Sequence, residues 1–327
     1  MKAFPDPSSS PAHYTRTLAI FGVKLVAAAS TDVGRWIRAF HSVVHLHVSA
    51  RGWRDDDRIS LTPFHELSPT VKSLCLKCSS FPSSETLNLV CSFPLLEDLT
   101  FIPFGHETEA DEWTTPLTSP KLTGSLTVSS VVGWVGSTVR RLINLPNGLR
   151  FTKIVLVWVW DADPNLARDL VMRCSETLES LDVTEELHGE SPPLLCLIGT
   201  LPIRSGRGTE FDLSMATKLK DLVFRSNLPS VRWITRALRS VKSNGLQRIT
   251  LRSDLYTFTN PIQEATYQEW WDLDRLLVQF RTSRSICPKV VYEIKCEEEE
   301  MRGYALNMLP ELTRRGLVDL VKYSNSW

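Results

Sequence analysis

A short pattern of apolar and polar residues recurs along the chain, in the form apolar-x-x-Leu-x-apolar, with Ile in place of Leu once. Within each copy the later positions alternate between apolar and polar, so that every second side chain faces the same way. Such alternation predicts a β-strand with one buried and one exposed face. The six copies occupy residues 43–48, 71–76, 96–101, 178–183, 219–224 and 246–251.

The spacing between copies is nearly constant where they follow one another directly. Copies that begin at residues 43, 71 and 96 lie 28 and 25 residues apart, and 27 residues separate those at 219 and 246. A period in the twenties is typical of leucine-rich repeats. We therefore expect an α/β fold, a leucine-rich-repeat-like solenoid (horseshoe) with a parallel sheet on the concave side and helices on the convex side.

The rest of the chain fits the same alternation of strands and helices. Pro229 suits a first helical position, and Gly245 suits a helix C-terminal cap. Residues 153–160 are apolar on both faces, so this strand is expected to lie centrally with its second face covered. Helices are expected over 33–40, 85–93, 130–145, 165–177, 229–242 and 267–281. Further strands are expected at 15–21, 153–160, 289–295 and 317–323, with either a degenerate strand or a protruding loop near 211–213.

The composition narrows the class of protein. Among 327 residues, 37 Lys and Arg balance 37 Asp and Glu, so the basic excess typical of nucleic-acid or membrane binding is missing. Seven Cys do not suggest a disulfide framework, and the N-terminus lacks the apolar run of a signal peptide. We expect a cytoplasmic or nuclear protein, with a Pro- and Ser-rich disordered lead-in at 1–13 and a single irregular leucine-rich-repeat domain at 14–327.

Three short clusters have a chemical interpretation, and each has a simpler one. His41, His45 and His47 have a spacing that can ligate zinc, but no Cys or carboxylate pair completes a tetrahedral set. Cys75 and Cys78 form Cys-x-x-Cys at the end of a strand, whereas a redox motif begins a helix. Residues 297–300 are four Glu, which we expect in a solvated loop.

The sequence motifs of common enzymes are missing. The chain has no Gly-rich phosphate loop, no Gly-x-Ser-x-Gly and no His-Glu-x-x-His. Tryptophans at 158, 160, 270 and 271 fit core packing better than a ligand site, although Trp also anchors interfaces. We predict no catalytic residue, no metal site and no cofactor, and we keep an α/β enzyme as a remote alternative.

The stretch Leu-Val-Cys-Ser-Phe-Pro-Leu-Leu-Glu-Asp-Leu-Thr at 89–100 is the most specific in the chain. Together with 71–76, 178–183 and 217–224, it resembles mushroom-type fungal F-box proteins with degenerate leucine-rich repeats, over residues 14–324. In that family an N-terminal helical F-box docks on a Skp-type adaptor of a cullin ubiquitin ligase. This chain starts near the first strand after that module. The resemblance therefore implies the repeat region alone, with no residue expected to bind the adaptor.

These observations favour a non-enzymatic protein–protein recognition scaffold. The resemblance implies the substrate-binding region of an F-box-type ubiquitin ligase receptor, with a Skp-type adaptor as partner only if an F-box exists upstream. The alternative is a box-less structural or decayed family member without a ligase role. Neither nucleic acid nor a membrane is an expected partner. A protein partner is expected to bind the outward-facing strand residues of the concave side, with these candidates: His45, His47, Lys72, Cys75, Asp98, Thr100, Ser180, Asp182, Arg248 and Thr250.

Overall fold

The fold is taken from a computed structural model. Its described residues belong to two compact units, Met1–Phe151 and Thr152–Trp327, and each unit is an α/β layer whose parallel strands follow one another in chain order. The predicted α/β class and parallel strands are thus confirmed, while the single domain over 14–327 stays a prediction. The structure describes residues 11–21, 37–50, 61–67, 69–78, 83–103, 119–129, 136–159, 164–186, 212–226, 231–253, 264–283, 287–294 and 298–322.

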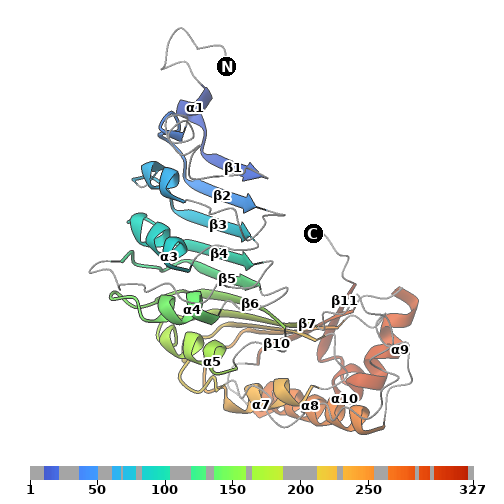
Figure 1. The fold of residues 1–327 in the computed structure, drawn as a ribbon. Coiled ribbons are helices and arrows are strands. Elements are labelled where there is room, and N and C mark those ends of the chain that lie inside the picture. The colour runs from blue at the N-terminus through green and yellow to red at the C-terminus, as the bar shows by residue number, and fades with distance from the viewer. Residues whose placement is uncertain are drawn as a thin grey trace, which may run out of the picture. The chain divides into compact units, whose positions relative to one another are not determined.

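In the first unit, five parallel strands lie side by side in chain order (Figure 1). They are β1 (Thr17–Phe21), β2 (His45–Ala50), β3 (Ser73–Cys78), β4 (Asp98–Pro103) and β5 (Ser125–Ser129). The described helices of this unit are α1 (Pro11–Tyr14), the 3-10 helix η3 (Thr62–Leu67), α3 (Ser83–Ser92) and α4 (Gly136–Ile143). Residues 11–13 of the predicted lead-in lie in α1, and residues 1–10 lie outside the described ranges.

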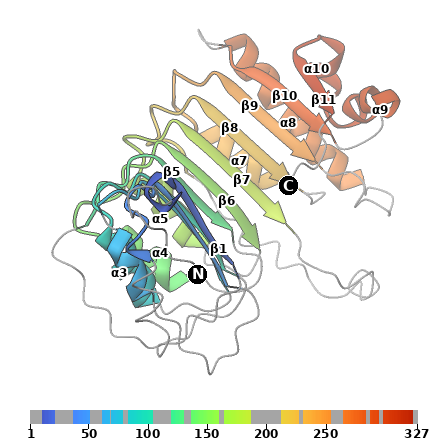
Figure 2. The ribbon, with the colours of Figure 1, turned by 90° about the horizontal axis from the view of Figure 1, so that it is seen from above.

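The second unit continues the same plan with six parallel strands, seen side by side in Figure 2. None of its described helices, nor those of the first unit, has the length and apolar character needed to cross a membrane. The strands are β6 (Lys153–Val159), β7 (Ser180–Glu186), β8 (Asp221–Ser226), β9 (Arg248–Ser253), β10 (Lys289–Ile294) and β11 (Val318–Lys322). The helices are α5 (Pro164–Arg173), α7 (Arg232–Ser240), α8 (Glu264–Ser283), α9 (Glu298–Met308) and α10 (Pro310–Arg314).

Leucines of successive strands pair with one another and form the core side of the strand layer in each unit. Leu46 pairs with Leu74, and Leu74 pairs with Leu99. In the second unit Leu181 pairs with Leu222. Each of these side chains is at most 1% exposed, and burying a Leu contributes about 1.5–3 kcal/mol. A shift of one residue in register would turn the whole row to the other face, so the leucines fix the strand pairing.

A backbone carbonyl just before a strand accepts hydrogen bonds from two consecutive amides at the start of the next strand. Glu179 O, for example, accepts from Lys220 N at 2.7 Å and from Asp221 N at 3.0 Å. The arrangement involves only backbone atoms, so it aligns strand starts that are 25 or 41 residues apart in the chain. The same arrangement occurs at the carbonyls of Arg16, Val44, Lys72, Thr152 and Lys220.

The helices of the second unit pack against the face of its sheet that carries buried aromatic rings. Phe224 on β8 meets Trp233 on α7 edge to face, with ring centroids 5.4 Å apart. Tyr292 on β10 lies 5.9 Å from Trp270 on α8, so Trp270 packs in the core as predicted, whereas Trp271 is 43% exposed. Because side chains alternate along a strand, the residues next to Phe224 and Tyr292 point to the opposite face.

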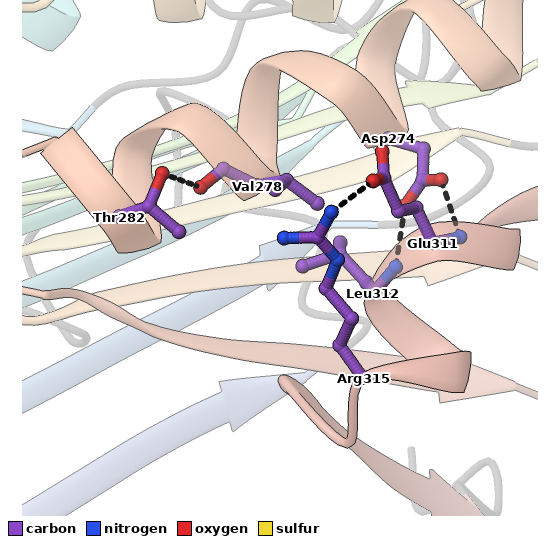
Figure 3. Close-up of polar contacts among 6 residues, drawn as sticks. All are labelled: Asp274, Val278, Thr282, Glu311, Leu312 and Arg315. Carbon is purple, nitrogen blue, oxygen red and sulfur yellow. Dashed lines mark hydrogen bonds and ion pairs between the residues drawn. The ribbon is translucent and has the colours of Figure 1, made fainter.

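Carboxylates of α8 hold the starts of two other helices. Asp274 accepts hydrogen bonds from the backbone amides of Glu311 and Leu312, at 2.7 and 3.0 Å, at the start of α10 (Figure 3). Glu269 accepts the amide of Val231, the residue before α7, at 3.2 Å. The first amides of a helix have no partner within the helix. The N-cap residues of α7 and α10 make no side-chain capping hydrogen bond. Carboxylates of α8 therefore accept the hydrogen bonds of the backbone amides at the starts of these two helices.

The ends of α7 differ from the prediction. The helix begins at Arg232, and Pro229 lies outside the described residues. Its C-cap is Val241, in an extended conformation, so Gly245 is not the cap that the sequence suggested. Instead Gly245 lies in the following turn, where its amide donates to Ser243 Oγ at 3.2 Å. The helix ends at the apolar residue Val241, which sequence rules for glycine caps do not anticipate.

One strand was not predicted. Leu122 and Leu126 lie four positions apart, one more than the recurring pattern allows, yet Ser125–Ser129 forms β5. Leu122 itself pairs with Leu149 in an isolated bridge, and Leu126 pairs with Leu99. Near 211–213, the described residues 212 and 213 are not in a strand, which leaves the loop alternative for them. The parts of the predicted helices at 33–36 and 130–135 lie outside the described residues.

Candidate functional site

In the first unit, two rows of predicted candidates cross neighbouring strands. His45 pairs through Ser73 with Asp98, and His47 pairs through Cys75 with Thr100. These positions are half-buried or exposed, while the leucines between them are buried. Five of the candidates therefore share one face of the strands: His45, His47, Cys75, Asp98 and Thr100.

The carboxylate of Asp98 makes hydrogen bonds within the sheet, to the neighbouring strand β5. Its Oδ1 accepts hydrogen bonds from the amide and the hydroxyl of Ser125, both at 2.7 Å. Gly124 precedes this serine, and a Cβ there would lie 2.6 Å from the same oxygen. The carboxylate thus joins β4 to β5, and it is a structural contact as well as a member of the face.

His47 is half-buried and has an open ring nitrogen. Its ring meets that of Phe21 edge to face, with centroids 5.2 Å apart, and its Nε2 is buried without a hydrogen-bond partner. Burial, and then the charge of Lys77, lower the pKa of His47 below 6.5. Both effects favour the neutral imidazole over the charged form. The ring of His41 lies 5.2 Å from that of His13. No group of three or more His, Cys, Asp or Glu among the described residues is arranged to hold a metal ion.

The candidates Lys72 and Cys75 differ in exposure. Lys72 lies one residue before β3 and forms an exposed ion pair with Glu97 at 3.2 Å, which contributes little to stability. Cys75 is half-buried on β3, and burial raises the pKa of its thiol. A raised pKa keeps the sulfur protonated and therefore poorly nucleophilic.

In the second unit, polar and charged side chains lie on the sheet face opposite α7 and α8. Arg225 on β8 donates from Nη2 to Asp182 Oδ2 on β7 at 2.6 Å. On the next two strands Arg252 forms an ion pair with Glu293, its direct cross-strand neighbour. We call these residues, together with the two threonines beside them, the polar strip: Asp182, Thr184, Arg225, Thr250, Arg252 and Glu293.

Three of the six residues of the polar strip are buried, and Arg225, Arg252 and Glu293 are half-buried. Asp182 is 7%, Thr184 4% and Thr250 5% exposed. Ion pairs removed from water in this way are screened less than surface pairs, so their geometry is more strongly fixed. Two other candidates, Ser180 and Arg248, lie one row away at the starts of their strands, where both pair with Asp221. Ser180 is half-buried and Arg248 is exposed.

Sequence reasoning selected Asp182 and Thr250 but missed Thr184, Arg225, Arg252 and Glu293. The recurring pattern ends at its sixth residue, and the missed residues of β7, β8 and β9 lie one position beyond it. Extending the period-two alternation by one step would have found them. No protein-family model matches the chain, and no curated protein matches its sequence.

Proposed function

We propose that this chain is a leucine-rich-repeat solenoid that recognises a protein partner through the strand face opposite its helices. The leucine registers and the carbonyl arrangement at the strand starts support the repeat assignment, because one local geometry recurs at successive strands. The F-box resemblance makes the partner a ubiquitination substrate and the chain the recognition region of a ligase receptor.

The observation that carries this proposal is the pairing of opposite charges on the strand face. Asp182 with Arg225 and Arg252 with Glu293 balance each other between strands, and Lys289 pairs with Asp319 at 2.6 Å. A core face needs no such pairs, and a surface without a partner gains little from fixing them. Fixed mixed charge gives a protein interface its specificity, without attracting highly charged ligands in general.

The test is a quantitative pull-down of the tagged full chain from its source cells, with two charge-swapped variants. The first exchanges Arg252→Glu and Glu293→Arg, which keeps an ion pair but inverts its direction on the strand face. The control exchanges Asp272→Arg and Arg275→Asp, an exposed pair on α8. We expect the wild-type chain and the α8 variant to recover the same partner proteins, and the strand-face variant to lose them.

A partner set that is identical for all three proteins would overturn the proposal. Recovery of a Skp-type adaptor and a cullin would support the ligase assignment. Loss of strand-face partners without any ligase component would favour a box-less scaffold.

A further inference from the structure

The polar strip contains hydrogen-bonding capacity that the chain does not use. Arg225 and Asp182 share a single hydrogen bond, between Nη2 and Oδ2, which leaves Asp182 Oδ1 and Arg225 Nε free. Thr184 Oγ1, on the same strand face, is also without a partner. All three atoms are buried, and Asp182 and Thr184 are more than nine-tenths buried as residues. Leaving such groups unpaired is costly, so their retention points to a ligand.

The free atoms differ in polarity, which restricts what they bind. Asp182 Oδ1 accepts a hydrogen bond, Arg225 Nε donates one, and the Thr184 hydroxyl does either. The ion pair has no net charge. A carboxylate would face the Asp182 oxygen, and an ammonium or guanidinium group would face Arg225, so each would meet one repulsive contact. A neutral group that donates and accepts side by side meets none.

We propose that Asp182, Thr184 and Arg225 bind the side-chain carboxamide of an Asn or Gln in the partner protein. The amide NH₂ donates to Asp182 Oδ1, and the amide oxygen accepts from Arg225 Nε. Thr184 Oγ1 takes the remaining position of the same planar group. This inference rests on the proposed function and adds which chemical group of the partner the strand face recognises.

The placement of the three residues suits recognition of a carboxamide. Thr184 pairs directly with Arg225 across β7 and β8, and Asp182 lies two positions earlier on the same face. The chemistry comes from side chains that the sheet fixes on rigid strands, which favours precise recognition. A partner that lacks the amide leaves buried charged groups unpaired, which costs about 10- to 100-fold in affinity.

The experiment is a selection of displayed random 12-residue peptides on the full-length chain. The test variant is Asp182→Leu with Arg225→Met, which replaces the pair by apolar groups of similar size and so preserves packing. A second variant, Thr184→Val, removes only the hydroxyl. The matched control, Asp272→Leu with Arg275→Met, makes the same change on α8. Thermal melting identifies any variant that fails to fold.

We expect wild type and the α8 control to enrich peptides with Asn or Gln at one fixed position. The selected peptide should bind the Asp182/Arg225 variant at least 10-fold more weakly and Thr184→Val several-fold more weakly. In a selected peptide with Gln at the fixed position, replacing this Gln by Glu or Leu should weaken binding to the wild-type chain by a similar factor. The same replacement should leave the affinity for the Asp182/Arg225 variant unchanged.

Two outcomes separate this inference from the proposed function. Peptides without a fixed amide, whose binding is nevertheless lost in the Arg252→Glu/Glu293→Arg protein, would overturn the carboxamide site and leave recognition by the strand face standing. Peptides that bind every variant equally, or no enrichment on wild type, would overturn both.

Discussion

The amide and the hydroxyl of Ser125 both donate to one oxygen of Asp98, each at 2.7 Å. One carboxylate thus joins β4 to β5, beside the pairing of Leu99 with Leu126. This changes how a binding experiment on the strand face is designed. Substituting Asp98 removes the contact between β4 and Ser125, whereas Thr100 lies on the next row of the same strand face.

Asp98→Ala should lower the free energy of unfolding by about 1–3 kcal/mol, because two part-buried donors on Ser125 lose their acceptor. Urea denaturation followed by circular dichroism measures this. Glu97→Ala, one residue earlier and exposed, is the control, with an expected change within about 0.5 kcal/mol. Equal losses in both variants would show that the Ser125 contact contributes nothing.

Gly124→Ala should also destabilise the protein, by about 1–3 kcal/mol, because its Cβ would lie 2.6 Å from Asp98 Oδ1 and 2.9 Å from the Glu97 carbonyl. In the Asp98→Ala background the cost should shrink, since one of the two clashes is gone. Gly303→Ala, in α9 with nothing within 4 Å of the new Cβ, should instead stabilise by about 0.5–1 kcal/mol. A neutral Gly124→Ala would contradict the close approach.

Asp274→Ala should lower the free energy of unfolding by about 1–3 kcal/mol, because the first amides of α10 lose a buried acceptor. Asp272→Ala, two residues earlier on α8 with a half-exposed side chain, is the control. Hydrogen exchange should locate the effect in residues 309–315. Faster exchange spread evenly over the second unit would argue against a capping role.

Asp274 also makes stability depend on pH. Burial raises the pKa of its carboxyl above 3.8 in the folded protein, so the folded state holds this proton to a higher pH than the unfolded state does. Its contribution to the free energy of unfolding therefore falls as pH rises from about 3.8 through the raised pKa. Asp274→Asn does not titrate, so this decline should be absent from its profile. Parallel profiles for the two proteins would refute the raised pKa.

His47 should make the free energy of unfolding depend on pH in the opposite sense to Asp274, and in a higher pH range. Its pKa is lowered from 6.5 by burial and by Lys77, so the unfolded chain takes up this proton first. The free energy of unfolding should be highest above about pH 6.5 and should fall as pH drops from there through the lowered pKa. His47→Gln should flatten this fall. His45→Gln, on the exposed end of the same strand, controls for the loss of an imidazole, and equal flattening by both would contradict the prediction.

The sequence by itself determined the strands, their phase and the α/β class. The period-two alternation acts within a few residues, and burying a leucine on the wrong face is costly enough to fix which side chains point outward. It also located α3, α4, α5, α7 and α8, but it missed η3, α9 and α10. The four glutamates at 297–300 were expected in a solvated loop, and that expectation was wrong, because α9 begins at Glu298. It failed at β5, where one extra residue broke the pattern, and at Gly245, where the helix had already ended at Val241.

The tertiary structure alone decided which outward-facing residues meet. Asp182 and Arg225 are 43 residues apart in the chain, and nothing local relates them until β7 and β8 pair. The same pairing set their single shared hydrogen bond and left Asp182 Oδ1 and Arg225 Nε open. Hydrogen bonds depend on distance and direction between strands, and a sequence pattern fixes only the direction in which each side chain leaves its own strand.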